Sequence, residues 1–217
     1  MIVDLNLHDK TIIVIGGGKE AQKRINSLLK QGCEILVISD YVNSQISKLV
    51  KAKKIKLKKQ KIQDAKFISK LKPNMIITTT NDKNLNQKII NSAKKIKIIA
   101  YSSDNPEDSD FSNPAIIDFE NMIQIAIFTG GRSPAMSKKI RIQSEKIFKN
   151  LITKEDIAQI KIQQIARNLA KSKIDTQIRR KAFLKSISNN NEIKQLIKDG
   201  KPKKAENYII TILKDWK

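Results

Sequence analysis

Three glycines stand together early in the chain, at Gly16, Gly17 and Gly18, and a small residue, Ala21, follows them. Their spacing fits the G-x-G-x-x-[G/A] pattern of dinucleotide-binding turns. In such a turn the first glycine permits a tight bend, Gly18 lets the backbone approach a pyrophosphate, and Ala21 lets the next helix pack close to a sheet. The N-terminus of that helix offers unpaired N–H groups and a partial positive charge. These residues predict a dinucleotide site.

An acidic residue, Asp40, lies 22 residues after Gly18, at the end of the next apolar run. A carboxylate at this distance accepts hydrogen bonds from both ribose hydroxyls of a dinucleotide, and it repels a 2′-phosphate. We therefore predict NAD rather than NADP as the cofactor. The alternative is a glycine turn in an α/β sheet that binds nothing.

The elements that position these residues follow from apolar periodicity. Ile12–Ile15 is a continuous apolar run, typical of a strand buried on both faces. A helix with one apolar face follows the glycines and ends at Gly32, and Ile35–Ile38 begins a second strand. The pattern then repeats, with helices expected at Val42–Val50, Ile62–Leu71 and Lys83–Lys94, and strands at Ile55–Leu57, Asn74–Thr80 and Ile96–Ala100. This order predicts a Rossmann-type α/β fold with a parallel, doubly wound sheet.

Polar residues end two of the expected strands. Thr79 and Thr80 lie at the carboxyl end of a parallel strand, where ligands bind in such sheets, and Asp82 is placed to cap the next helix. The polar run Tyr101–Pro114 follows the last strand and is expected to overhang the nucleotide site. It contains Asp104, the best candidate for a general base; the alternative is a simple turn cap.

The rest of the chain changes character after residue 113. Ala115–Ile117 and Met122–Thr129 alternate like strands, and we expect them to be added to the sheet. A second glycine turn then leads into a helix at Ala135–Leu151, and its backbone N–H groups are expected to hold an anion near Arg132. The residues of this candidate substrate-binding turn are Thr129, Gly130, Gly131, Arg132 and Ser133. From Thr153 onward only helical periodicity remains, so we predict three regions: 1–113, 114–152 and 153–217.

The overall composition limits the classes of function that the protein can have. The net charge is +22, from 43 basic and 21 acidic residues. This excess reflects either codon composition or an acidic partner, such as a nucleic acid, an anionic lipid or a polycarboxylate. Arginine and aromatic residues are scarce, which argues against nucleic acid. With one histidine, His8, and one cysteine, Cys33, we predict no metal site in the protein. No apolar run is long enough to span a membrane and no signal peptide is recognisable, so a cytoplasmic protein is expected.

Five motifs occur in one order along the chain: Gly16-Gly17-Gly18-x-x-Ala21-x-Lys23-Arg24, Thr79-Thr80-Asn81-Asp82, Asp104-x-Pro106, Phe111-x-x-Pro114 and Thr129-Gly130-Gly131-x-Ser133-Pro134. This ordered set resembles the precorrin-2 dehydrogenase module of siroheme synthase. The resemblance implies NAD-dependent oxidation of precorrin-2 to sirohydrochlorin, with insertion of ferrous iron in some members. It also implies a homodimer with strands and helices exchanged between subunits.

The resemblance also implies roles for individual residues. The pairs Lys19-Glu20 and Asp40-Tyr41 fall where the family contacts NAD, and Asp104 falls on its essential aspartate. Two positions depart from the family: Glu20 usually is aliphatic, and Tyr101 usually is asparagine. Two other function classes remain as alternatives, namely an NAD-sensing regulator whose basic helices bind nucleic acid, and a non-catalytic carrier of tetrapyrrole.

Overall fold

The computed structural model describes residues 2–216. The chain separates into two compact units, a first unit that ends at Asn113 and a second unit that begins at Pro114. A further division of the second unit at residue 152 stays a prediction.

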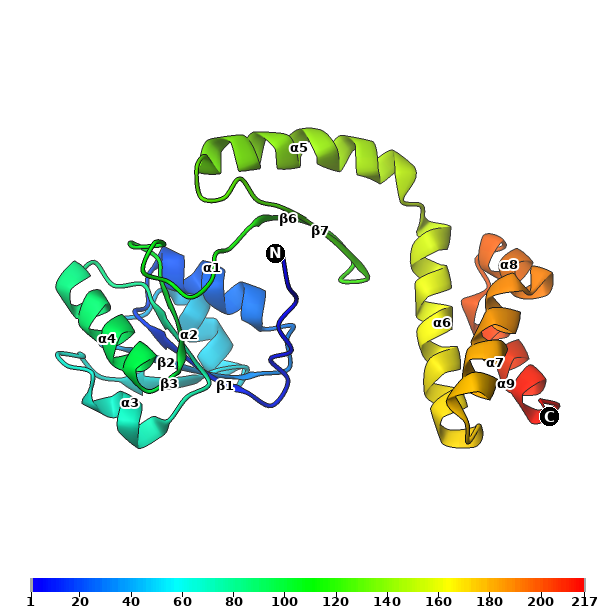
Figure 1. Ribbon diagram of the computed structural model, residues 1–217, viewed down its shortest axis with the longest axis horizontal. Helices are drawn as coiled ribbons and strands as arrows, with labels where there is room; N and C mark the ends of the chain where they lie inside the picture. The colour runs from blue at the N-terminus through cyan, green and yellow to red at the C-terminus, as the bar shows by residue number, and fades with distance from the viewer. Residues whose placement is uncertain (1, 217) are drawn as a thin grey trace. The chain divides into compact units, whose positions relative to one another are not determined.

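The first unit is a five-stranded parallel sheet with helices on both faces (Figure 1). The strand order β3-β2-β1-β4-β5 reverses its direction of growth at β1, and this confirms the predicted doubly wound sheet. The strands are β1 (Thr11–Ile15), β2 (Glu34–Ser39), β3 (Lys56–Lys59), β4 (Met75–Thr78) and β5 (Ile99–Ser102), and the helices are α1 (Lys19–Leu28), α2 (Ser44–Lys51), α3 (Lys66–Leu71) and α4 (Lys83–Lys95).

Alternation along β1 divides the core of this unit into two layers. Ile12 and Val14 pack with α1 and α2 on one face, and Ile13 and Ile15 pack with α3 and α4 on the other. All four side chains are buried because a parallel sheet is covered on both sides. The connection from β1 to β2 lies on one face and the connection from β4 to β5 on the other, so a crevice opens at the carboxyl ends of β1 and β4.

The strand β3 forms one edge of the sheet, as its short alternating sequence predicts. Lys56, Lys58 and Lys59 are exposed and only Leu57 is partly buried. Lys56 pairs with Glu34 on the neighbouring strand at 3.1 Å.

Several expected boundaries in the first unit are wrong, among them the starts of one helix and one strand. The helix expected at Ile62–Leu71 begins only at Lys66, where Asp64 accepts a hydrogen bond from the Lys66 N–H. The strand expected at Ile96–Ala100 begins at Ile99, because α4 continues to Lys95 and the turn after it places Lys97 at φ +60°. As a consequence β5 extends through Tyr101 and Ser102, which are buried strand residues rather than part of a polar loop.

The second unit opens with an antiparallel hairpin of β6 (Ala115–Phe119) and β7 (Ile123–Ile127). These strands pair with each other and form a separate two-stranded sheet, so the expectation that they are added to the parallel sheet is wrong. The reason lies in the two residues that follow Phe119. Glu120 and Asn121 have φ values of +54° and +58°, the paired positive angles of the tight turn that closes a hairpin.

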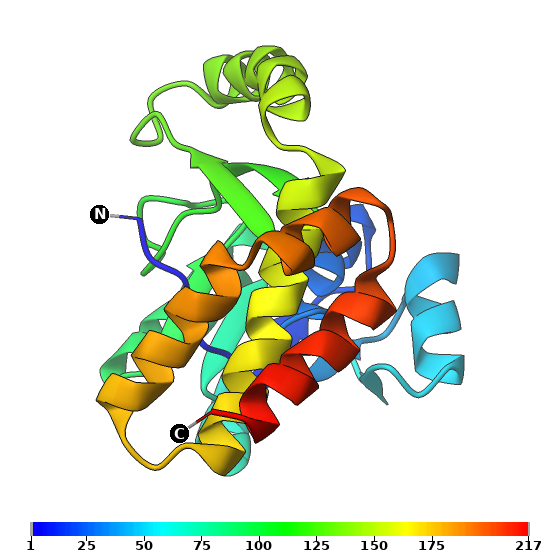
Figure 2. The ribbon, with the colours of Figure 1, turned by 90° about the vertical axis from the view of Figure 1, so that its right-hand side faces the viewer.

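The remaining elements of the second unit are helices: α5 (Pro134–Leu151), α6 (Lys154–Lys173), α7 (Gln177–Asn189), α8 (Asn191–Lys198) and α9 (Pro202–Lys214). The last four pack side by side around Phe183, which is fully buried and meets Trp216 edge-on (Figure 2). Within residues 2–216, none of the helices has the length and apolar character needed to cross a membrane.

Candidate functional site

The first glycine turn joins β1 to α1, and at two of its positions the packing of neighbouring atoms leaves no room for a residue other than glycine. A Cβ on Gly17 would lie 1.9 Å from the Tyr41 carbonyl oxygen and 2.8 Å from the Val42 Cα. A Cβ on Gly16 would lie 2.6 Å from the Thr79 Oγ1, and Gly16 also has φ +109°. Backbone from the segments after β2 and β4 therefore closes directly on this turn, and no side chain fits there.

The third glycine, Gly18, has the opposite environment. A Cβ built on Gly18 meets nothing within 4 Å. Gly18 is the N-cap of α1, and no side chain caps this helix terminus. Free space and unpaired N–H groups at a helix N-terminus are what a pyrophosphate requires, so the residues present fit a dinucleotide.

A cavity of about 450 Å³ lies at the carboxyl ends of the first four strands. It brings together Gly16, Asp40 and Thr80, three of the residues predicted to bind the cofactor. The other lining residues are Ile15, Ile38, Ser39, Gln60, Lys61, Ile62, Asn81, Asp82 and Leu85. The Asp40 carboxylate thus lies at the cavity, where a ribose would be held, and apolar side chains offer a surface for a planar base.

Other predicted cofactor residues lie beside the cavity. The Thr79 hydroxyl donates to the Ile15 carbonyl at 2.8 Å and so joins the ends of β4 and β1. Tyr41 contributes its carbonyl oxygen to the close approach at Gly17, while its side chain is 69% exposed. Lys19 is exposed in the first turn of α1.

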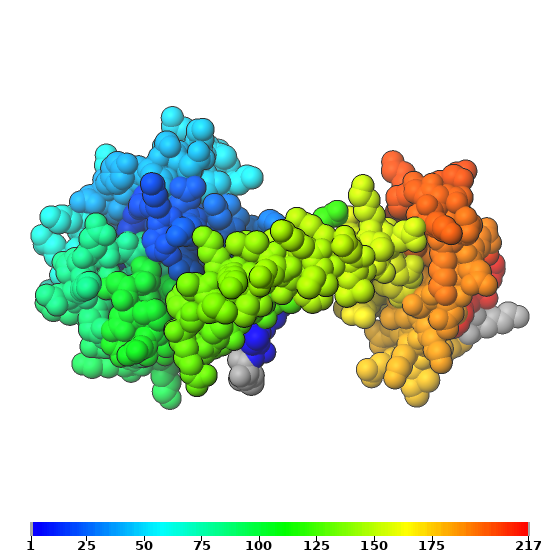
Figure 3. Space-filling model, turned by 90° about the horizontal axis from the view of Figure 1, so that it is seen from above, coloured from blue at the N-terminus to red at the C-terminus, as the bar shows by residue number. Residues whose placement is uncertain are grey.

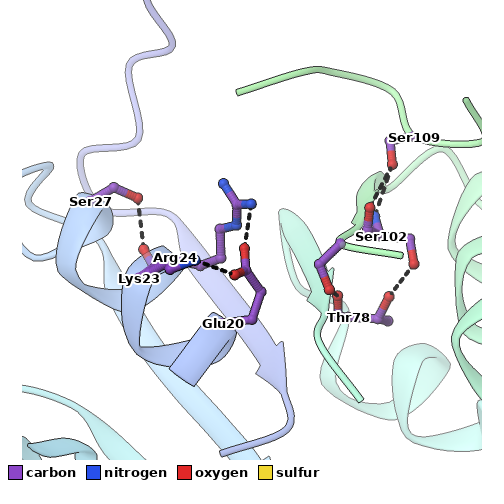
Figure 4. Close-up of polar contacts among 8 residues, drawn as sticks. Glu20, Lys23, Arg24, Ser27, Thr78, Ser102 and Ser109 are labelled. Carbon is purple, nitrogen blue, oxygen red and sulfur yellow. Dashed lines mark hydrogen bonds and ion pairs between the residues drawn. The ribbon is translucent and has the colours of Figure 1, made fainter. Parts of the chain in front are cut away.

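The acid at Glu20, in the first turn of α1, is neutralised locally. Its carboxylate accepts hydrogen bonds from Arg24 at 2.5 Å and from Lys23 at 3.0 Å (Figure 4). Partial burial alone would raise the pKa of Glu20, but the hydrogen bonds and positive charges of Lys23 and Arg24 outweigh it and lower this pKa. Both partners lie on the C-terminal side of Glu20, so its side chain points away from the N-terminus of α1. The carboxylate therefore does not occupy the place where an anion would bind.

The same arginine explains the second departure from the family. The Arg24 guanidinium lies over the Tyr101 ring, 4.8 Å from its centroid, and the other ring partner of Tyr101 is Phe111 at 5.0 Å. A cation over a buried aromatic ring is stabilising, and an asparagine would not provide it. Glu20 and Tyr101 therefore belong to one arrangement, in which Arg24 connects α1 to β5 and to the loop that carries Asp104.

Asp104 ends a buried polar network at the carboxyl ends of β4 and β5. Its Oδ1 accepts hydrogen bonds from the Ser102 hydroxyl at 2.5 Å and from the Asn86 amide at 2.9 Å. Ser102 in turn lies 2.9 Å from the Thr78 hydroxyl. Thr78, Asn86 and Ser102 are at most 1% exposed, whereas Asp104 is exposed. A carboxylate is thus presented to solvent from a fixed, buried support, and Figure 4 shows the part of this support formed by Thr78 and Ser102.

The loop after Asp104 is tied to the sheet by its own polar residues. The Ser109 hydroxyl accepts from the Ser102 N–H at 2.9 Å, and the Asp110 carboxylate accepts from the Ala100 N–H at 2.8 Å. The acidic run is therefore ordered by backbone hydrogen bonds rather than free in solvent.

The second glycine turn, Thr129–Ser133, belongs to the second unit. Gly130 and Gly131 have φ values of +65° and +76°. The Ser133 hydroxyl accepts from the Met136 N–H and caps α5, and the Thr129 hydroxyl donates to the Ser133 carbonyl. The turn is formed as predicted, but the hydroxyls of Thr129 and Ser133 already have partners, in the turn and in α5 respectively.

Sequence patterns missed three residues of the Asp104 network, namely Thr78, Asn86 and Ser102. A signal for Asn86 was available. Asn86, Ile90 and Ala93 lie at i, i+4 and i+7 of α4, so an amide stands in the apolar stripe of a helix. A buried amide in such a stripe needs a polar partner.

Among the described residues, no group of three or more His, Cys, Asp or Glu side chains is arranged to hold a metal ion.

The comparisons with known proteins match these features. The model of the putative NAD(P)-binding family matches residues 3–115, which is more than half of the chain. The chain belongs to this family. The matched residues contain the glycine turn, Asp40 and Asp104, so the cofactor class inferred from the geometry agrees with the family description.

Siroheme synthases are among the similar proteins. The siroheme synthase of Nitrosospira multiformis is 28% identical over 145 residues, which cover 65% of this chain and 30% of that protein. The siroheme synthase of Baumannia cicadellinicola is 28% identical over 208 residues, covering 94% of this chain and 42% of that protein. These matches confirm the resemblance read from the five motifs. The chain spans less than half the length of these curated relatives.

A solved structure described as "SirC, precorrin-2 dehydrogenase" has the same fold. It superposes with a TM-score of 0.68 at 21% identity and covers 97% of this chain and 99% of that one. The match therefore extends over the hairpin and the C-terminal helices as well as the parallel sheet.

Proposed function

We propose that the protein oxidises precorrin-2 to sirohydrochlorin with NAD, in the biosynthesis of siroheme. The observation that carries this proposal is the Asp104 carboxylate, fixed by buried donors at the carboxyl edge of a dinucleotide-binding sheet. The likeness to siroheme synthases and to the fold of SirC gives the substrate class.

The reaction removes a hydride and a proton from the substrate. NAD, when bound, supplies the acceptor for the hydride. The chain must orient the substrate and take the proton, and Asp104 is the candidate general base because its carboxylate is exposed and held in place.

The choice of NAD over NADP rests on Asp40. Its carboxylate lines the cavity at the end of β2, where it accepts hydrogen bonds from ribose hydroxyls and repels a 2′-phosphate. We expect Asp40→Asn to weaken NAD binding and to reduce the preference over NADP, as measured by titration calorimetry with both cofactors.

Precorrin-2 is a polycarboxylate, and the chain carries a net charge of +22. We assign substrate carboxylates to the turn of Thr129, Gly130, Gly131, Arg132 and Ser133, with Arg132 as the charged donor. Arg132→Gln is expected to raise the KM for the substrate while the affinity for NAD stays unchanged.

We further propose a homodimer in the cytoplasm. The hairpin of β6 and β7 packs on α5, and a two-stranded sheet has too small a core to be stable alone. The surface of α5 is drawn in yellow-green in Figure 3, and its residues Ile147 and Leu151 are 67% and 66% exposed. A second copy of the chain would cover these apolar side chains. Light scattering on Ile147→Glu should show a monomer if this surface forms the dimer, and an unchanged mass would exclude it.

An anaerobic assay tests the activity. Purified protein is mixed with enzymatically generated precorrin-2 and NAD without metal, and NADH formation is followed beside the absorbance of sirohydrochlorin. Equal amounts of both products would establish the dehydrogenase, and addition of ferrous iron would test iron insertion in the same cuvette. Bound NAD without turnover would favour a tetrapyrrole carrier.

Asp104→Asn keeps the size of the side chain and removes the base. We expect it to lower kcat at least ~100-fold, since a general base typically contributes this much. Oxidation at the wild-type rate would remove Asp104 from the mechanism.

A further inference from the structure

We propose that Asn86 is a positioning residue that fixes which oxygen of Asp104 accepts the substrate proton, and that it links this base to the cofactor edge of the sheet. This inference rests on the proposed function. It adds a residue of α4 that no motif contains.

The contacts of Asn86 use the whole amide. Its Nδ2 donates to the Thr80 carbonyl oxygen at 2.9 Å and to the Asp104 Oδ1 at 2.9 Å, and its Oδ1 accepts from the Thr80 hydroxyl at 2.7 Å. Both amide hydrogens are therefore engaged. The side chain is 1% exposed, so water does not compete for these contacts.

These partners also fix the orientation of the amide. If Asn86 were rotated by 180° about its last bond, its oxygen would face the Thr80 carbonyl and the Asp104 carboxylate, which are both acceptors. The Thr80 hydroxyl would also lose its 2.7 Å acceptor, the Asn86 oxygen, and keep only the longer contact to the Asp82 carbonyl at 3.3 Å. Only one of the two orientations satisfies every group, so the donor toward Asp104 is always present.

The network around Ser102 leads to the same oxygen. Ser102 has one hydroxyl hydrogen and gives it to the Asp104 Oδ1, so the Thr78 hydroxyl must be the donor in its contact with Ser102. Both hydrogen bonds that Asp104 accepts from the described residues end on Oδ1. A proton taken from the substrate therefore goes to Oδ2.

Asn86 also connects the base to the cofactor. Its two contacts with Thr80 hold a residue that lines the nucleotide cavity, two residues after the last residue of β4, Thr78. A single buried amide thus sets the separation between the cofactor edge and the base. Hydride and proton leave the same substrate, so this separation matters for the reaction.

The experiment compares Asn86→Ala and Asn86→Asp with Asn91→Ala, an exposed asparagine on the same helix that serves as the control. The kinetics of NADH formation and the pH–rate profile are measured in the full chain. Asn86→Ala removes a donor to a carboxylate, and we expect kcat to fall about tenfold while the KM for NAD changes less than about threefold. Asn91→Ala should match the wild type.

Asn86→Asp keeps the shape and places a second carboxylate against Asp104. Two carboxylates that share a site cannot both ionise at the usual pH, so the acidic limb of the pH–rate profile should move about 1–2 pH units upward. The neighbouring acids Asp82 and Asp108 are the same in every variant. A purely structural role would lower the rate without moving the profile. Folded Asn86 variants with wild-type kcat and an unmoved profile would overturn the proposal.

A measurement without turnover separates this inference from the proposed function. The Asp104 carboxyl carbon is followed by ¹³C NMR during a pH titration, with Asp104→Asn to assign the signal. The midpoint should move upward in Asn86→Asp, which places a second carboxylate against Asp104. If the wild type does not oxidise precorrin-2, the function fails while this titration still decides the role of Asn86. Unmoved midpoints would reject it.

Discussion

The molecule contains two glycine turns that each lead into a helix, and they differ in what requires the glycines. In the turn Gly16–Gly18, neighbouring backbone comes so close that a Cβ on Gly17 would lie 1.9 Å from the Tyr41 carbonyl oxygen. In the turn Thr129–Ser133, a Cβ on Gly131 meets nothing within 4 Å, and only the positive φ favours glycine. The helix after the first turn has no side-chain cap, whereas Ser133 caps the helix after the second.

This difference distinguishes two turns that look alike in sequence by how well each is suited to bind an anion. The first turn is built into the core of its unit and leaves its helix N-terminus open, so an anion completes it. The second turn satisfies part of its own backbone with Thr129 and Ser133, so the substrate role proposed for it would depend more on the Arg132 side chain than on N–H groups.

The largest expected effect is that of Gly17→Ala. The new Cβ would collide with backbone that cannot move aside without shifting the segment after β2, and we expect a loss of about 3 kcal/mol in the stability of the first unit. Hydrogen exchange of the β1 and β4 amides measures the stability of this unit. The fluorescence of Trp216, the only tryptophan in the sequence, reports the unfolding of the second unit, whose stability should not change. Wild-type exchange in β1 would contradict the packing argument.

Gly18→Ala, one residue further on, should give the reverse result. Its Cβ occupies free space where a pyrophosphate is expected, so stability should stay within about 0.5 kcal/mol while the affinity for NAD falls at least about tenfold. Titration calorimetry beside the same exchange measurement tests both halves. Unchanged affinity would mean that the cofactor does not pass over Gly18.

In the second turn, Gly131→Ala should cost about 1 kcal/mol, because alanine is strained at φ +76° but meets no atom. Urea unfolding followed by Trp216 fluorescence gives the value. A loss as large as that of Gly17→Ala would show that the second turn is also closely packed, and the contrast between the turns would fail.

The smallest expected effect is the loss of an ion pair in the helices that follow the two turns. Each helix carries a Glu–Arg pair four residues apart: Glu20 with Arg24 in α1, and Arg141 with Glu145 in α5. The pKa of Glu20 lies below its ordinary value of 4.5 in the folded chain. The unfolded chain therefore takes up the proton first on acidification, so the stabilisation is complete above about pH 4.5 and is lost as the pH falls through the folded pKa.

We expect this stabilisation to amount to about 0.5 kcal/mol after screening by solvent. Glu20→Gln should remove the corresponding part of the pH dependence of the stability of the first unit, as followed by hydrogen exchange between pH 5 and pH 3. Glu145→Gln is the matched control, because it removes the corresponding acid from the second unit. An equal effect of both variants on the first unit would show that the pair in α1 has no local role.

Much of the first unit could be predicted from sequence because its signals are local. The buried run of β1, the glycines after it and the Asp82 cap of α4, whose carboxylate accepts from the Leu85 N–H, each depend on a few consecutive residues. The pairing of β6 with β7 could not be predicted in the same way. Alternation indicates a strand but not its partner, and the deciding feature was the positive φ of Glu120 and Asn121.

The site was predictable to the same extent. Gly16 and Asp40 were expected from spacing and Thr80 from its place at the end of a strand, and all three line one cavity. The support of Asp104 was not expected, since Asn86 and Ser102 come from different elements and meet only in the folded chain. The stacking of Arg24 on Tyr101 was hidden for the same reason, although each residue departs little from an ordinary helix or strand position.

The lysines of β3 have a consequence for how copies of this chain can associate. An unpaired edge of a sheet can recruit another strand, and this is a common route to aggregation. Here a strand arriving at β3 would meet Lys56, Lys58 and Lys59 in four residues, and a second copy of the same strand would bring the same charges against them. Electrostatic repulsion between these lysines thus opposes edge-to-edge pairing of two copies at β3, so any association of copies would have to use another surface.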